Sequence, residues 1–341
     1  MRVLVVMNFG ADPATPQRGR WVIDQVEALR EAGLDVDLFS FRPGKDQYLR
    51  ATRRIRKILR ESRYDLVHAH YGLAGWCAQL AGADPLVVTF HGTDVRHRIV
   101  GRMSRALSHR IRLVAGASKA LFEEEAGRPG LPAPEGRSAV LPCGADLSRF
   151  ERIDRKDARR HLGLDPGASF LFFPADPDRP EKRADRAREV ASRAGAELLT
   201  GGGIEPEEMP FWMNAANAVL VTSEYEGFGL ACLEALACDV PVISTPVGIA
   251  PHALRGLNRS LCFEFDPEVW SDFASALLIE ADPRSDGRGR AEALSARRMA
   301  DRVALAYEDL LAEGPEATLS NSANCGGGRV SGGDLGNDGE N

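Results

Sequence analysis

The stretch AVLVTSEYEGFGLACLEALACDVPVIS, residues 218–244, contains one complete unit of the pattern that decides the fold. The apolar run at 218–222 predicts a strand, residues 228–238 predict a helix, and the apolar run at 241–244 predicts a second strand. Short strands that are apolar on both faces and separated by helices indicate a parallel sheet covered on both sides.

The same alternation extends in both directions from this stretch. Further strands are expected at 3–6, 36–41, 64–70, 86–92, 112–118, 138–142, 170–175 and 196–200. Further helices are expected at 18–33, 48–62, 76–82, 181–194 and 296–314. The polar segment 146–166 separates two such series and predicts a linker with one short helix.

We therefore predict an α/β protein of two doubly wound, Rossmann-like domains that face each other across a cleft. The first domain is expected to span residues 1–150 and the second residues 151–295. A last helix at 296–313 is expected to cross back to the first domain. The Gly/Ser/Asn-rich segment 314–341 has little to bury and is predicted to be disordered.

Composition agrees with a globular protein of about two domains, because 44% of the 341 residues are hydrophobic and 27% are charged. The net charge of −6 divides into +7 for residues 1–150 and −13 for the remainder, which suggests domains with different partners. Six scattered cysteines without a Cys-x-x-Cys pair favour reduced thiols in a cytoplasm over disulfides or zinc. Neither a signal peptide nor a run of about 20 apolar residues is recognised.

Two glutamates in the opening stretch point to a ligand site. Glu226 precedes a turn in which Gly227 and Gly229 permit close approach of a ligand, and Glu234 interrupts an apolar helix. A carboxylate can accept hydrogen bonds from two neighbouring hydroxyl groups, which sugars and riboses offer. The helix N-terminus adds unpaired backbone N–H groups for a phosphate, with candidate donors at Phe228, Gly229 and Leu230. A solvated surface turn is the alternative, which the apolar surroundings of Glu234 disfavour.

This segment resembles the Glu-(x)7-Glu signature of the retaining glycosyltransferases of the GT-B fold, specifically family 4, which includes bacterial mannosyl- and glucosyltransferases. The resemblance covers about residues 1–313. Each supporting match is weak alone, but together and in order they are specific: Arg18-Gly19, VHAHYG (67–72), TFHGTDV (89–95), GASKAL (116–121), LPCGADLSRF (141–150) and RPEKR (179–183).

The resemblance implies roles for the second domain. Glu234 would bind the donor ribose, Glu226 would contact the transferred sugar, and Lys182 would hold the donor diphosphate. The family's usual Gly-Arg-Leu is absent after the strand at 170–175, and Arg179 can take the place of its arginine. The alternative for Lys182 is a solvated residue in a charged run. Gly201, also after a strand, either borders the nucleotide base or turns the chain.

The first domain offers candidates around the transferred sugar and the acceptor. Gly19 resembles the glycine loop that approaches donor phosphate and acceptor, while Arg18 is either an acceptor-side residue or part of an ordinary helix start. The family places His91 near the transferred sugar, and Asp94 would orient His91 or reach an acceptor hydroxyl. Two further residues at strand ends, His70 and Ser118, are expected on the acceptor side. His68 is expected in the core.

No metal or other cofactor is predicted. Asp176-Pro177-Asp178 has the Asp-x-Asp form of a metal ligand pair, but its prolines suggest a plain turn, and a GT-B site uses cations and helix dipoles in place of metal. The segment 247–249 and His252 depart from the family pattern beside the base pocket, so the nucleotide is left unnamed.

Two basic segments, 50–63 and 96–112, can either lie on anionic lipid or pack an apolar side on the sheet and solvate their charges. They raise the prospect of an anionic or lipid-linked acceptor and of peripheral contact with the inner face of a membrane. Nucleic acid is not expected as a partner, because no recognition motif and no interleaved aromatic residues accompany the charge.

The resemblance and the residues together predict a retaining, metal-independent enzyme that moves a hexose from a nucleotide-diphosphate sugar to an alcohol acceptor. An epimerase or phosphorylase of the same fold is one alternative. A nucleotide-sugar-binding subunit without transfer activity is another, because the loop at 174–179 is altered. A Rossmann dehydrogenase is disfavoured, since no Gly-x-Gly-x-x-Gly follows the first strand.

Overall fold

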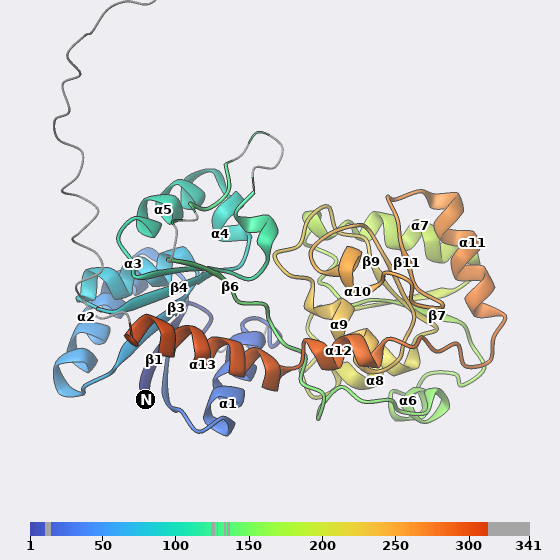
Figure 1. Ribbon diagram of the computed structural model, residues 1–341. Coiled ribbons are helices and arrows are strands. Elements are labelled where there is room, and N and C mark those ends of the chain that lie inside the picture. Colours follow the sequence, from blue (N-terminus) through green and yellow to red (C-terminus); the bar gives the residue numbers. More distant parts are fainter. Residues whose placement is uncertain (11–14, 124–126, 128, 133, 135–136, 313–341) are drawn as a thin grey trace, which may run out of the picture.

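The computed structural model describes residues 1–10, 15–123, 127, 129–132, 134 and 137–312. The chain forms two α/β halves that lie side by side, each built around a parallel sheet (Figure 1). We call the half that contains β1–β6 the N-terminal domain and the half that contains β7–β11 the C-terminal domain. The proposed tail 314–341 lies outside the described residues.

The N-terminal sheet has six strands in the order β2-β1-β3-β4-β5-β6, and every neighbouring pair is parallel. Its strands are β1 (Arg2–Met7), β2 (Asp35–Ser40), β3 (Leu66–His70), β4 (Leu86–Phe90), β5 (Leu113–Gly116) and β6 (Ser138–Val140). Its helices are α1 (Arg20–Glu31), α2 (Lys45–Glu61), α3 (Gly72–Ala81), α4 (Thr93–Arg96), α5 (Arg98–Ser108) and the short 3₁₀ helix η1 (Lys119–Leu121).

The C-terminal sheet has five strands in the order β11-β10-β9-β7-β8, again all parallel. Its strands are β7 (Phe170–Phe173), β8 (Glu197–Thr200), β9 (Ala218–Val221), β10 (Val242–Ser244) and β11 (Leu261–Cys262). Its helices are α6 (Arg155–His161), η2 (Pro180–Lys182), α7 (Ala184–Ala194), α8 (Met209–Ala215), α9 (Leu230–Ala237), α10 (Ala250–Ala253), α11 (Pro267–Leu278) and α12 (Arg288–Ala293).

Strand residues alternate between two apolar layers, as the period of a strand requires. In β1, Leu4 and Val6 belong to the core under α2 and α3, whereas Val3 and Val5 belong to the core under α1 and the last helix, α13 (Ala296–Ala312). In β7, Phe172 faces the core that contains α8 and α9, and its neighbours face α7 and α11. Burial on both faces explains why these strands are apolar throughout.

The last helix lies on the N-terminal domain, along α1 (Figure 1). Met299, Val303 and Tyr307 are buried there in one apolar cluster with residues of β1 and α1. The two chain crossings between the domains also touch, because the amide of Ala145 donates to the carbonyl of Leu294 and the amide of Ala296 donates to the carbonyl of Ala145. The junction therefore consists of two adjoining segments of backbone.

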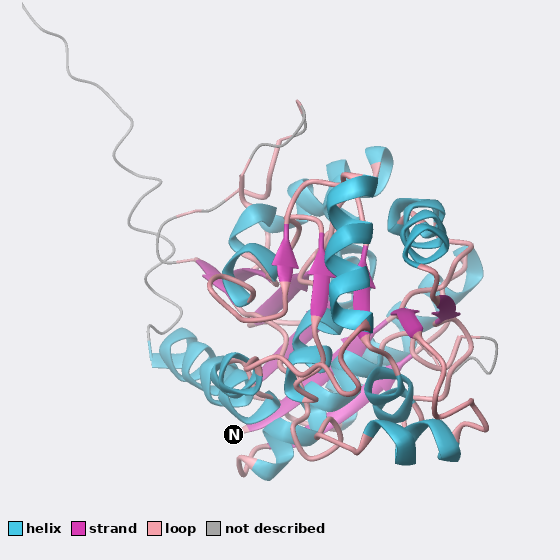
Figure 2. Cartoon of the chain, turned by 90° about the vertical axis from the view of Figure 1, so that its right-hand side faces the viewer, coloured by secondary structure: helices cyan, strands magenta, loops and turns pink. Residues whose placement is uncertain are grey.

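Several elements differ from the sequence-based expectations in detail. The expected helix at 181–194 is divided: η2 ends at Lys182, Arg183 takes a left-handed conformation, and α7 starts at Ala184. The expectations also omitted β11 and α11, which Figure 1 labels in the C-terminal domain. Figure 2, turned so that this domain faces the viewer, shows strands covered by helices. Within the described part of the chain, none of the helices combines the length and apolar character needed to cross a lipid bilayer.

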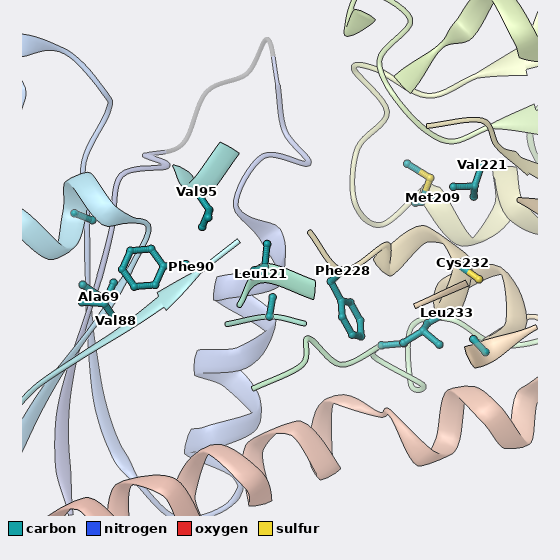
Figure 3. Close-up of a cluster of buried hydrophobic side chains, with 14 of the residues drawn as sticks. Ala69, Val88, Phe90, Val95, Leu121, Met209, Val221, Phe228, Cys232 and Leu233 are labelled. Carbon is teal, nitrogen blue, oxygen red and sulfur yellow. The ribbon is translucent and has the colours of Figure 1, made fainter. Parts of the chain in front are cut away.

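An apolar cluster continues from one domain into the other. Phe228, in the loop before α9, is 6% exposed and belongs to the same cluster as Leu121 of the N-terminal domain and Leu233 of α9. Figure 3 shows the Phe228 ring between these two leucines. Buried apolar contact contributes roughly 25 cal/mol per Å², so this ring helps to hold the two domains together.

Candidate functional site

Two backbone loops meet where the domains join. One follows β4 and contains His91 and Gly92, and the other follows β9 and contains Gly227. A Cβ atom on Gly227 would lie 1.7 Å from the carbonyl oxygen of His91, and one on Gly92 would lie 3.0 Å from the Cα of Gly227. Gly92 also has φ of 110°, which side chains rarely tolerate. Both glycines are therefore required for the loops to approach each other.

Lys182 and Glu226 form an ion pair beside this contact. The Lys182 Nζ donates to both carboxylate oxygens of Glu226, at 2.6 and 2.8 Å, and Ser223 Oγ donates to one of them at 2.7 Å. The two charged side chains are only 13% and 14% exposed. Thr222 Oγ1 donates to the Lys182 carbonyl at 2.8 Å and so fixes the loop after β7 to the end of β9. Two residues that lie far apart in sequence are thus brought together.

The helix α9 begins directly after these residues. Gly229 caps it in a left-handed conformation with φ of 91°, so Leu230 is the first helical residue. The amides of Phe228 and Gly229 donate to no backbone carbonyl in the portion of the chain that is described. These N–H groups and the helix dipole together make an anion-binding end of the kind that a phosphate occupies.

Glu234 lies in the second turn of α9, and burial raises the pKa of its carboxyl group to about 7. The positive charge of Arg149 opposes this rise, whereas Asp24 adds to it. Arg149 is itself held by Asp24, with Nη1 and Nη2 at 3.2 and 2.8 Å from the two carboxylate oxygens. Asp24 is only 4% exposed although it stands in α1.

The sequence reasoning did not assign a role to Asp24 or Arg149. An aspartate on the apolar face of the helix at 18–33 was the signal available for Asp24. Arg149 stood within the quoted motif LPCGADLSRF without a role of its own. The charge on Glu234 therefore depends on a pair that only the folded chain assembles.

Two buried histidines, His68 and His70, and one half-buried histidine, His91, occupy the N-terminal side of the junction. His68, His70 and His91 follow each other in a stack, with ring centroids 4.4 Å and 5.2 Å apart. Burial lowers the pKa of His68 and of His91 to about 3 and lowers that of His70 well below its usual value. All three rings are therefore neutral at physiological pH. His91 also stacks on Tyr71 at 5.0 Å.

Asp94 braces the loop that carries His91. It accepts hydrogen bonds from the backbone amides of Gly72, His91 and Gly92 at 3.1, 3.0 and 3.0 Å. Its side chain is buried, at 3% exposure, so the structure favours the orienting role over contact with an acceptor hydroxyl. His70 requires a correction as well: it is 0% exposed and lies behind His91, so it offers no surface to an acceptor.

The remaining candidates lie around the same junction or near it. Gly19 precedes α1 with φ of 85°, and a Cβ atom there would lie 2.6 Å from the Cβ of Phe9. Arg18 is exposed, with its guanidinium group 5.2 Å from the centroid of the Phe9 ring. The Ser118 hydroxyl is buried without a hydrogen-bond partner among the described residues. Arg179 is half exposed and pairs with Glu181 at 2.6 Å.

Asp176 forms a turn, because its Oδ1 accepts from the amide of Asp178 at 2.9 Å. Gly201 packs against this loop: a Cβ atom there would lie 2.4 Å from the carbonyl group of Pro174. Across the described residues, no group of three or more His, Cys, Asp or Glu side chains is arranged to hold a metal ion.

The glycosyltransferase family 4 pattern matches residues 36–149, and the glycosyl transferases group 1 pattern matches residues 182–286. D-inositol 3-phosphate glycosyltransferase of Actinosynnema mirum is 30% identical over 291 residues, which cover 67% of each chain. The chain belongs to glycosyltransferase family 4. D-inositol 3-phosphate glycosyltransferase of Mycolicibacterium gilvum is 29% identical to this glycosyltransferase. The matched region covers 66% of the present chain and 61% of the Mycolicibacterium gilvum enzyme.

Solved structures agree with this GT-B fold. Sucrose-phosphate synthase from Thermosynechococcus elongatus has a TM-score of 0.71 at 20% identity, with 92% of this glycosyltransferase and all of that chain covered. The Anabaena protein Alr3699/HepE, in complex with UDP and glucose, has a TM-score of 0.68 at 17% identity, with 90% and 99% covered. The fold predicted from the sequence, two doubly wound domains, is confirmed.

Proposed function

We propose that this glycosyltransferase moves a hexose from a nucleotide-diphosphate sugar to a hydroxyl acceptor, with retention of the anomeric configuration and without a metal. The observation that carries the proposal is the meeting of Lys182, Glu226 and the start of α9 at one point of the domain junction. A lysine beside a helix N-terminus can hold the negative charge of a departing diphosphate.

When the donor binds, Lys182 and Glu226 must each form contacts with it in addition to their contact with each other. Lys182 turns its ammonium group toward the diphosphate oxygens, and Glu226 accepts from hydroxyl groups of the sugar. The bond between the anomeric carbon and the diphosphate breaks, and the acceptor oxygen bonds to that carbon on the same face. The proton of the acceptor passes to the departing phosphate oxygen, so no separate base is required.

The nucleotide part of the donor is assigned to α9. Glu234 accepts from the two ribose hydroxyls, which suits a carboxylate that has little solvent around it. The Anabaena neighbour holds UDP and glucose, which supports a nucleotide sugar as the donor in this fold.

The acceptor is proposed to be an alcohol that carries negative charge. The relatives from Actinosynnema mirum and Mycolicibacterium gilvum are named for an inositol phosphate. Arg18 and Arg96 stand on the N-terminal side of the junction, and Arg96 lies 5.1 Å from the ring centroid of Tyr225 on the other side. Guanidinium groups at this junction suit an anionic group on the acceptor.

We also propose peripheral contact with the cytoplasmic face of a membrane. The basic face formed by α2 and α5 supports this contact. Leu49 of α2 and Ile99 of α5 are 64% and 65% exposed among arginines. A hollow of about 450 Å³ on α2 is lined by Arg53, Arg56, Lys57, Arg60 and Glu61. Sedimentation with vesicles of anionic lipid, compared with neutral vesicles, tests this contact; equal recovery would remove it.

Thermal shift with UDP-, GDP- and ADP-sugars tests the donor site directly. One of these donors is expected to raise the melting temperature of the wild-type protein and to have much less effect on Glu234→Ala. Equal responses of both proteins would show that the ribose is bound elsewhere. Release of free nucleoside diphosphate only when an alcohol acceptor is added would separate transfer from epimerisation or from binding without turnover.

A further inference from the structure

The contact between His70 and His91 determines where the protons of both rings lie. His70 Nδ1 and His91 Nε2 are 3.0 Å apart, which is a hydrogen-bond distance. Both rings are neutral, because burial lowers both pKa values. Each ring therefore carries one N–H group and one bare nitrogen. One ring donates in this contact and the other accepts.

The second nitrogen of His70 decides between the two arrangements. His70 Nε2 is buried and has no hydrogen-bond partner in the described residues. A buried N–H group without a partner is rarer and more costly than a bare acceptor nitrogen. The proton of His70 is therefore on Nδ1, where it has an acceptor. His91 Nε2 must then be the bare nitrogen, and the single proton of His91 must be on Nδ1.

We propose that His70 fixes His91 in the Nδ1–H form, so that His91 acts as a neutral hydrogen-bond donor to the bound sugar and not as a base. The second half of this statement rests on the proposed function, whereas the proton position does not. His70 is a positioning residue in this scheme, since it reaches the ligand only through His91.

The surroundings of His70 explain why its own orientation is fixed. Its ring lies between those of His68 and His91. His68 is held in turn, with Nδ1 2.6 Å from Tyr307 Oη and Nε2 2.7 Å from Thr89 Oγ1. Tyr307 belongs to α13, so the returning helix supports the far end of the stack.

Proton positions can be read directly by NMR on the unliganded protein. Long-range correlations in protein labelled with ¹⁵N-histidine distinguish an imidazole protonated at Nδ1 from one protonated at Nε2. His91 is assigned by the signals that disappear in His91→Asn, and it is expected to show a protonated Nδ1. A protonated Nε2, or a doubly protonated ring at neutral pH, would overturn the proposal whether or not a sugar donor is ever found.

Two substitutions at position 70 separate the donated hydrogen bond from simple packing. His70→Asn keeps an N–H group near the place of Nδ1, whereas His70→Leu fills the space without a donor. The leucine variant is expected to lower kcat by about 10–100-fold with little change in KM. This is less than the roughly 10²–10³-fold cost of a lost transition-state donor, because the donor on His91 is misoriented and not removed. The asparagine variant is expected to recover most of that loss. Equal losses in both variants would contradict the proposal.

His68→Leu is the matched control, because His68 lies on the same strand, is equally buried and packs on the His70 ring, but its hydrogen bonds go to Tyr307 and Thr89 and not to His91. This variant is expected to melt at a lower temperature and to keep the Nδ1 proton on His91. In His70→Leu, by contrast, the His91 signals should shift toward a mixture of both forms. A change of the His91 signals in the control but not in His70→Leu would refute the assignment to His70.

Discussion

Two clusters of side chains at the domain junction, one on each side, present opposite kinds of chemistry. The C-terminal side carries the ion pair of Lys182 and Glu226 and the carboxyl group of Glu234 around the start of α9. On the N-terminal side, the ends of β3 and β4 present uncharged, stacked imidazoles, of which His70 is buried and His91 is half-buried. A departing diphosphate requires fixed positive charge, whereas sugar hydroxyls can be oriented by neutral donors. In the proposed reaction, the charged cluster would stabilise the leaving group and the neutral cluster would orient the sugar.

The largest effect is expected when the charged side loses its cation. Lys182→Ala should lower kcat by about 10²–10³, because one preorganised contact to the departing phosphate is removed. Arg188→Ala is the control, since Arg188 is an exposed cation on the neighbouring helix α7 and should leave kcat unchanged. Steady-state kinetics measure both variants. A loss of less than threefold in Lys182→Ala would mean that the leaving group is stabilised elsewhere.

A somewhat smaller effect should follow when the two sides are pushed apart. In Gly227→Ala the added methyl group would collide with the His91 carbonyl, so the loops must separate, and a misplacement of about 1 Å can cost 10²-fold in rate. Gly289→Ala is the matched control, because a Cβ atom there meets nothing within 4 Å in helix α12. Values of kcat/KM for both variants, with melting temperatures, test the contrast. Full activity in Gly227→Ala would show that the loop contact is dispensable.

The smallest effect concerns the charge on Glu234. Its pKa is raised from 4.5 to about 7 in the folded protein, so its contribution to stability is complete below pH 4.5 and is lost as the pH rises through 7. Glu234→Gln should therefore raise the free energy of unfolding at pH 8, by on the order of 2 kcal/mol. The gain should vanish near pH 4.5.

Denaturant unfolding of both proteins across pH 4.5–8 measures this difference. Glu197→Gln is the control, because Glu197 is exposed at the start of β8 and should show no comparable trend. A Glu234→Gln variant that is less stable than the wild type at pH 8 would show that Arg149 outweighs the cost of burial. In that case the charged side would be stabilised before any donor binds.

The same contrast explains how far the sequence could predict this site. Glu226, Gly227, Gly229 and Glu234 share one short stretch, and local pattern was enough to single them out as a site. A glycine that follows a strand indicates a place where another group approaches the backbone closely, even when that group is not known from the sequence. The fold was predictable for a similar reason, because apolar strands alternate with helices along the whole chain.

The neutral side depends on contacts that no local pattern carries. His70 was expected near the acceptor because it ends a strand, yet its side chain points into the layer beneath His91. The partner of His68 is Tyr307, 239 positions away. Similarly, the pair of Asp24 and Arg149 joins positions 125 apart. Such pairings arise only when distant segments are packed together, so sequence spacing could not reveal them.

The returning helix α13 makes the N-terminal domain discontinuous in the chain. Its residues cover the same sheet face as α1, and the C-terminal domain is in effect an insertion between β6 and α13. During synthesis the inserted domain is complete before its host, since the host awaits the last segment to leave the ribosome. A fragment that ends before Ala296 would expose to water the apolar face of the N-terminal sheet that α13 covers. Separating the two domains of this enzyme therefore calls for a circular permutant and not a simple truncation.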